Sequence, residues 1–206
     1  MVDITEAEDG TDAAATGEGE VETLGEGSPT DDGENEDKTP IDISNVVYKN
    51  VFKKDKDEEV SKAVRELYDD ELNEEMATAA KATRLPFLCV VALDGDKAIG
   101  ISTIMMEPSQ ALWVKIGFFR CIVRTEYRRR GIATQLVNEC KKVLAAWSEE
   151  NPDANLKAMG VYTHLKLLGE KSKQPVCNKT GLTLVGYDNT GLQIRLAWFD
   201  NARVKY

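Results

Sequence analysis

Residues 122–133, with the sequence IVRTEYRRRGIA, decide the fold of this chain. The stretch begins with the end of an apolar strand, continues through three consecutive arginines, and ends with a glycine and a small residue before an amphipathic segment. The first N–H groups of a helix have no partner inside the helix and carry partial positive charge, so they bind anions. Gly131 and Ala133 lack bulk, which would let an oxygen atom approach the backbone closely. The stretch therefore predicts an anion-binding loop between a strand and a helix.

The segments on either side alternate between strand and helix patterns. After Gly131, apolar residues recur at helical spacing until Asn151-Pro152-Asp153 ends the helix. The other segments predicted as helices are residues 56–72, 73–83 and 165–173. The segments predicted as strands are residues 43–51, 87–93, 98–106, 113–124, 156–163, 182–187 and 192–199. Asp94-Gly95-Asp96-Lys97 predicts a hairpin, and Pro108 and Ser109 predict a loop.

Residues 122–133 also resemble the acetyl-CoA signature of the GNAT superfamily of N-acetyltransferases, in which a strand ending in Val is followed by a loop and then Tyr-Arg-x-x-Gly-Ile-Gly/Ala. The residues that fit this form are Val123, Tyr127, Arg128, Gly131, Ile132 and Ala133. The order of the predicted elements and Thr180-Gly181-Leu182, which precedes the last hairpin, fit the superfamily as well. The resemblance implies an α/β GNAT fold over residues 41–206, with a mixed central sheet of about seven strands splayed at the CoA site and about four helices.

The resemblance further implies where acetyl-CoA, the acetyl donor, would bind. The residues expected to contact it are Ile122, Val123, Arg128, Arg129, Arg130, Gly131, Ile132, Ala133 and Thr134. Backbone groups of the first two would pair with the pantetheine arm, and the loop and helix start would hold the diphosphate. The thioester would lie where strand 113–124 separates from strand 156–163. A backbone N–H group near Val123 would polarise the thioester carbonyl.

The residues that would transfer protons fit the superfamily pattern less well than the residues of the acetyl-CoA signature do. Acetyl transfer to an amine needs a neutral nucleophile and a proton donor for the leaving thiolate. Many members of the superfamily use a Tyr and a Glu, but this chain has Cys177 and Gly117 at the matching positions. The remaining candidates are Tyr162 as donor to the thiolate, His164 as proton acceptor, and Glu107 as the group that orients or deprotonates the amine. A structural role for each of them is the alternative, with positioning and water doing the rest.

The first 40 residues differ sharply from the rest of the chain. They contain fourteen Asp and Glu residues and one Lys, and few large apolar side chains. Such a segment cannot bury enough apolar surface to offset the entropy of ordering, so residues 1–40 are predicted to form a disordered acidic tail. It would serve as a solubilising tether, or as an anionic strip that competes with the ligand of the basic half. That half, residues 113–206, has sixteen basic and eight acidic residues, which is typical of a surface that meets an anionic ligand.

Cysteine usage and hydropathy indicate the compartment. The four cysteines form no CxxC pair and the chain has one histidine, so a metal site is not expected. Cys89 and Cys121 lie in apolar strands, where reduced buried thiols are expected. No signal peptide and no apolar run of about 18 residues is evident. The sequence predicts a cytoplasmic protein without a membrane partner.

The resemblance implies transfer of an acetyl group from acetyl-CoA to a primary amine by direct attack in a ternary complex. The acceptor, whether a small molecule, a protein or a nucleic acid, would be selected by the two early helices, the loop at residues 107–112 and the final hairpin. Two alternatives remain open. The domain would bind CoA without turnover, or its basic half would contact a nucleic acid or a modified base. The oligomeric state is not predicted.

Overall fold

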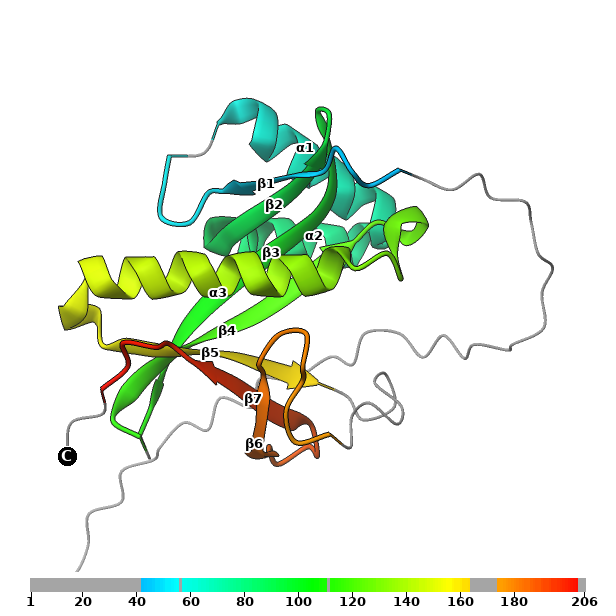
Figure 1. Ribbon diagram of the computed structural model, residues 1–206. Helices are drawn as coiled ribbons and strands as arrows, with labels where there is room; N and C mark the ends of the chain where they lie inside the picture. The colour runs from blue at the N-terminus through cyan, green and yellow to red at the C-terminus, as the bar shows by residue number, and fades with distance from the viewer. Residues whose placement is uncertain (1–41, 56, 111, 164–173, 204–206) are drawn as a thin grey trace, which may run out of the picture. The chain divides into compact units, whose positions relative to one another are not determined.

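The computed structural model describes residues 42–55, 57–110, 112–163 and 174–203, which lie in one compact unit spanning residues 40–206. Among these residues a seven-stranded sheet has the order β1-β2-β3-β4-β5-β7-β6 (Figure 1). β4 and β5 pair in parallel, and the other neighbours are antiparallel. The strands are β1 (Val47–Asn50), β2 (Leu88–Asp94), β3 (Lys97–Ser109), β4 (Val114–Val123), β5 (Leu156–Thr163), β6 (Thr183–Tyr187) and β7 (Gln193–Trp198). The predicted mixed sheet of about seven strands is confirmed.

Three α-helices flank this sheet within the described residues. They are α1 (Glu58–Glu71), α2 (Glu74–Thr83) and α3 (Ile132–Glu150). Asp57 and Asn73 cap α1 and α2, because their side chains accept hydrogen bonds from backbone N–H groups of the first turn. The fourth predicted helix, residues 165–173, and the predicted acidic tail, residues 1–40, lie outside the described residues. None of the described helices is long and apolar enough to cross a membrane.

The helices cover opposite faces of the sheet (Figure 1). On one face, α3 packs Ile132, Leu136 and Leu144 into an apolar cluster with β2, β3, β4 and β5. On the other face, α1 and α2 form a second cluster that includes Leu67 and Tyr68 and reaches β2 and β3. Full burial of each large apolar side chain contributes about 1.5–3 kcal/mol. The two clusters cover opposite faces of β2 and β3, while β4, β5 and β7 carry a third, smaller cluster.

The strands separate between β4 and β5. These two strands pair from Lys115 and Leu156 up to Phe118 and Gly160. Beyond that point β4 continues to Val123 alongside β3, whereas β5 continues to Thr163 alongside β7. The two ends diverge in Figure 1, with β4 running toward the start of α3 and β5 running toward β6 and β7. The predicted splay in the sheet is therefore present.

Two expectations about single residues in these strands are wrong. Pro108 and Ser109 belong to β3 and pair with Lys115 and Val114, instead of forming a loop. β2 pairs with β3 only as far as Thr103, so the following residues of β3 lie at an edge, where a proline breaks no ladder. Cys121 is exposed, because it lies in the part of β4 that β5 leaves uncovered.

Candidate active site

A short loop carries the chain from β4 to α3. It contains the 3-10 helix η2 (Thr125–Tyr127), which the Tyr127 ring anchors in the apolar core. The hydroxyl group of Tyr127 donates to a carboxylate oxygen of Asp94 at 2.7 Å. The backbone then takes positive φ values at Arg129 (63°) and Gly131 (89°). Because two residues so close together have left-handed backbone conformations, the loop turns sharply into the first turn of α3.

The start of α3 is open to a ligand. Gly131 is the N-cap residue and offers no side chain to the N–H groups of the first turn. The first turn closes when the N–H group of Gln135 donates to the Gly131 carbonyl at 3.0 Å, so the N–H groups of Ile132, Ala133 and Thr134 have no partner within the helix. A Cβ atom built on Gly131 would meet nothing within 4 Å. We call residues 129–134 the cradle; its exposed N–H groups and free space fit the phosphate oxygens of a cofactor.

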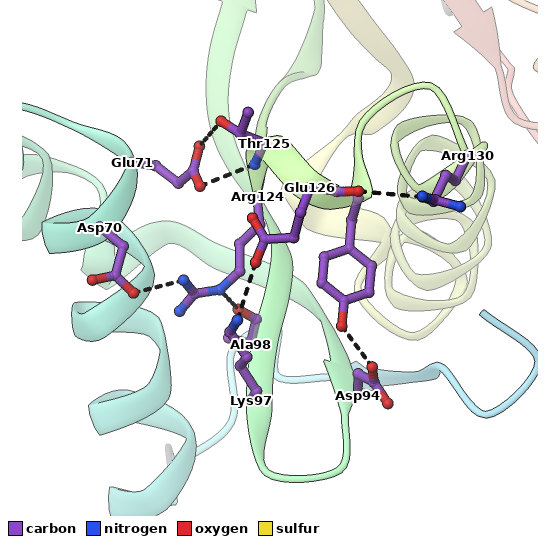
Figure 2. Close-up of polar contacts among 10 residues, drawn as sticks. Asp70, Glu71, Asp94, Lys97, Ala98, Arg124, Thr125, Glu126 and Arg130 are labelled. Carbon is purple, nitrogen blue, oxygen red and sulfur yellow. Dashed lines mark hydrogen bonds and ion pairs between the residues drawn. The ribbon is translucent and has the colours of Figure 1, made fainter. Parts of the chain in front are cut away.

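Two acidic residues at the end of α1 hold the loop that leads into the cradle. Figure 2 shows Asp70 and Glu71 pointing from α1 toward residues 124 and 125. Asp70 accepts from the Arg124 guanidinium at 2.6 Å, and Arg124 also donates to the carbonyl of Ala98 at 2.7 Å. Glu71 accepts from both the N–H group (3.0 Å) and the hydroxyl group (2.9 Å) of Thr125. The sequence did not reveal these contacts, because 54 residues separate the partners.

The three consecutive arginines are not equivalent. Arg128 turns back along the chain, donating to the Val123 carbonyl at 3.0 Å and to Glu71 at 2.8 Å. Arg130 donates to the Glu126 carbonyl at 3.2 Å (Figure 2). Arg129 is exposed. Arg128 and Arg130 therefore support the shape of the loop.

The hydrogen-bonding pattern of β4 decides which backbone groups face the splay. The N–H group of Arg124 donates to the Ile99 carbonyl in the ladder with β3. Because paired and outward-facing residues alternate in an antiparallel ladder, the backbone of Ile122 also belongs to this ladder. The backbone groups of Cys121 and Val123 then face the splay. Of the two residues expected to contact a pantetheine arm, Val123 is suitably placed and Ile122 is not.

Two of the candidates for proton transfer, Tyr162 and Glu107, lie on the face of the sheet that carries the α1/α2 cluster, Tyr162 beyond the last β4–β5 pair and Glu107 beside the paired part. The Tyr162 ring stacks on Phe118, with ring centres 4.5 Å apart and an interplanar angle of 18°. Glu107 lies within β3, opposite Ile116, on this same face. Burial raises the pKa of Tyr162, and the negative charges of Glu107 and Asp188 add to the rise, so both carboxylates lie within electrostatic range of its hydroxyl group. His164 lies outside the described residues.

The two positions that depart from the superfamily pattern have different environments. Gly117 lies under α3, and a Cβ atom there would come within 3.1 Å of Ile104 and 3.2 Å of Leu144, so a glutamate side chain has no room. Cys177 is half-buried beside the α3 cluster. Burial opposes ionisation of its thiol, but hydrogen bonds from Thr180 and from backbone N–H groups lower the pKa of Cys177 below the ordinary value.

The fold and the site together define an α/β protein with a splayed sheet beside a helix start whose first N–H groups have no partner within the helix. The sequence model of the acetyltransferase (GNAT) family matches residues 52–167. This chain belongs to the GNAT family of acetyltransferases.

Solved structures with a similar fold are distant in sequence. A GNAT-family N-acetyltransferase from Escherichia coli in complex with CoA has 14% identity and a TM-score of 0.51, and the match covers 75% of this chain and 81% of that one. An acetyltransferase of the GNAT family from Streptococcus pneumoniae has 12% identity, a TM-score of 0.46, and coverage of 75% and 99%. Naa50 from Arabidopsis thaliana, bound to a bisubstrate analogue, has 14% identity, a TM-score of 0.44, and the same coverage. No curated protein sequence matches this chain.

Proposed function

We propose that this protein transfers the acetyl group of acetyl-CoA to a primary amine by direct attack in a ternary complex. The observation that carries the proposal is the open cradle at the start of α3, next to the splay between β4 and β5. Family membership supports acetyl transfer, and the E. coli neighbour is a complex with CoA. No other feature of the described residues combines an anion site with a slot between strands.

The cofactor would be held mainly by main-chain atoms. N–H groups from Gly131 to Thr134 would donate to the diphosphate, and Arg129 would add a nearby positive charge. The N–H groups of Cys121 and Val123 face the splay and would hold the chain that follows the diphosphate. When bound, acetyl-CoA supplies an acetyl group activated as a thioester. Binding of the cofactor, orientation of the amine and proton transfer would all depend on groups of this chain.

Tyr162 and Glu107 are the proposed groups for proton transfer. The raised pKa of Tyr162 keeps its hydroxyl group protonated at neutral pH, so it can donate a proton to a leaving thiolate. The carboxylate of Glu107 would attract an ammonium group and orient it toward the splay. His164 stays a candidate proton acceptor at the end of β5. The stacking of Tyr162 on Phe118 fixes the direction of its hydroxyl group, which favours a specific role.

Thiol release from acetyl-CoA in the presence of a panel of amines tests this proposal. The expected result is amine-dependent release, with kcat reduced about 10- to 1,000-fold in Tyr162→Phe and acetyl-CoA affinity unchanged. Tyr187→Phe is the matched control, because Tyr187 is an exposed tyrosine on β6, which β7 separates from β5. If acetyl-CoA binds but no amine on the panel increases thiol release, the protein is a CoA-binding module and the transferase proposal is wrong.

A further inference from the structure

Two arginines on the α1/α2 face, Arg84 and Arg120, form no ion pair among the described residues. Arg84 is the residue that ends α2 and is half-buried, and Arg120 projects from β4. Burial lowers the pKa of Arg84, and the nearby charge of Arg120 lowers it further. Two guanidinium groups within electrostatic range of each other, one half-buried and one exposed, repel each other, and an anion between them would be stabilised.

The strand register places these arginines at the edge of the splay. Leu88, Thr103 and Arg120 lie in one row across β2, β3 and β4. Arg84 precedes the 3-10 helix η1 (Leu85–Phe87), which leads directly into Leu88. Arg120 also lies beyond the last pair that joins β4 to β5. An anion between the two guanidinium groups would therefore lie next to the proposed site of acetyl transfer.

Tyr68 provides a second, independent observation in the same place. This α1 residue is fully buried in the cluster that also contains Leu85, Leu88 and Ile122. Its hydroxyl group is the one buried side-chain polar atom of the described residues without a hydrogen-bond partner. Burial raises the pKa of Tyr68 to about 12, and the charge of Arg84 offsets part of the rise. An unpaired buried hydroxyl is costly in a protein that has no use for it, so a ligand at this point is the explanation we favour.

Charges of both signs act on the aromatic pair at the splay. The Tyr162 ring stacks on Phe118, which lies two residues before Arg120 on β4. The negative charges of Glu107 and Asp188 and the positive charge of Arg120 all act on the Tyr162 hydroxyl group. The face that would receive the acceptor therefore has cationic and anionic groups around one aromatic pair.

We infer that the acceptor amine also carries an oxyanionic group, a carboxylate or a phosphate, which binds at Arg84 and Arg120 while the amine lies at Tyr162 and Glu107. The inference rests on the proposed function and names the class of acceptor for the same site. Guanidinium groups bind both kinds of oxyanion through paired hydrogen bonds, and the Tyr68 hydroxyl group would be an additional donor. An amine that lacks the anionic group would leave the two arginines uncompensated.

Anion binding by the full chain is the first test. The protein is saturated with CoA so that the cradle is occupied, and thermal unfolding is followed as chloride is replaced by acetate or by inorganic phosphate at constant ionic strength. The expected result is a saturable rise in Tm with at least one of these anions. The rise should be lost in Arg84→Met and Arg120→Met and kept in Arg65→Met, which alters an exposed arginine of α1. A rise that is absent, or equal in all four proteins, overturns the inference.

Matched acceptors form the second test and distinguish the two oxyanions. An amino acid is compared with its amide, and phosphoethanolamine with ethanolamine, in the thiol-release assay. The anionic member of one pair should have a kcat/KM about 10-fold or more above its neutral partner, and Arg120→Met should remove this preference. Equal use of anionic and neutral acceptors overturns the inference. Failure of the proposed function has a different result, because no acceptor, anionic or neutral, would then increase thiol release.

The Tyr68→Phe variant has an expected result that a purely structural role of the hydroxyl group would not give. Since the hydroxyl group has no partner in the free protein, its removal should raise the Tm of the free protein while it reduces the anion-dependent rise. Opposite signs for stability and for anion binding support the inference. A variant that is less stable without anion, with an unchanged response to anion, contradicts it.

Discussion

Tyr68 and Tyr127 are both buried tyrosines, but their hydroxyl groups have different surroundings. The hydroxyl group of Tyr68 has no partner among the described residues, whereas that of Tyr127 donates to Asp94. We expect Tyr68→Phe to raise the free energy of unfolding by about 1 kcal/mol, since an unpaired polar group is removed from the core. Tyr127→Phe should lower it by about 1–2 kcal/mol, since a hydrogen bond to a carboxylate is lost. Urea denaturation of both variants measures the difference, and a loss of stability in Tyr68→Phe would contradict this description of its site.

Gly117 is another residue whose neighbours decide its identity. A Cβ atom at this position would lie 3.1 Å from Ile104 and 3.2 Å from Leu144. Gly117→Ala should therefore destabilise the protein by about 1–3 kcal/mol through overpacking. Gly186→Ala in β6 is the control, because a Cβ atom there meets nothing within 4 Å. Equal unfolding free energies for the two variants would show that α3 packs on β4 less tightly than the structure indicates.

The cysteines near the splay should differ in reactivity. Hydrogen bonds lower the pKa of Cys177 despite its partial burial. Packing around the sulfur raises the pKa of Cys121 to about 11, although the residue as a whole is exposed. The thiolate is the reactive form, so iodoacetamide should modify Cys177 first between pH 7 and 9, and Cys121 should gain reactivity only toward pH 11. Peptide mass spectrometry of timed samples measures both rates, and faster modification of Cys121 at pH 8 would refute this order.

At the scale of single elements, the end of α1 is unusual. Asp70 and Glu71 lie in its last turn, where acidic side chains oppose the helix dipole, and no basic residue accompanies them. Their contacts with the loop after β4 explain their presence. Glu71→Gln should weaken acetyl-CoA binding by about 5- to 10-fold, because Thr125 and Arg128 lose charge-assisted hydrogen bonds that fix the approach to the cradle.

Glu75→Gln is the control for this prediction. Glu75 lies in the first turn of α2, is exposed, and has no recorded hydrogen bond or ion pair. Isothermal titration of both variants with acetyl-CoA should give a weaker Kd for Glu71→Gln and an unchanged Kd for Glu75→Gln. If both variants bind as tightly as the unaltered protein, α1 does not help to shape the cradle.

Sequence patterns predict the elements of this fold well because each element carries its own signal. Apolar spacing identifies α1, α2 and α3, and the separation of β4 from β5 follows from the family resemblance. The end of β3 was missed, since a proline normally breaks a strand and only the tertiary arrangement shows that Pro108 lies at an edge. The contacts of Arg84, Arg120 and Tyr68 were also missed. Arg120 stands between apolar residues in the second half of β4, which is a local signal that the sequence offered.

At the scale of the whole molecule, the positive charge of residues 113–206 has several uses. Arg124 is buried and paired with Asp70, and Arg195 is buried and donates to Gln193 and to the carbonyl of Gln174. Lys141 donates to the carbonyl of Thr180. Charges committed to the fold in this way reduce the support for a nucleic-acid surface, which needs accessible bases along one face. A count of basic residues in the sequence does not show which of them are paired within the fold and which are accessible, because the partners come from distant segments.

The measurement that tests the account most directly is acetyl-CoA binding to Gly131→Asp and Gly191→Asp, compared with the unaltered protein. Both glycines have similar positive φ values, 89° and 84°, and open surroundings, so the substitutions strain the backbone alike. Only Gly131 lies in the cradle, where an aspartate would place a negative charge against the diphosphate. We predict that isothermal titration detects binding to the unaltered protein and to Gly191→Asp, and at least a 10-fold weaker Kd for Gly131→Asp, an effect of about 1.4 kcal/mol. Equal affinity in all three proteins would show that the diphosphate is not bound at the start of α3.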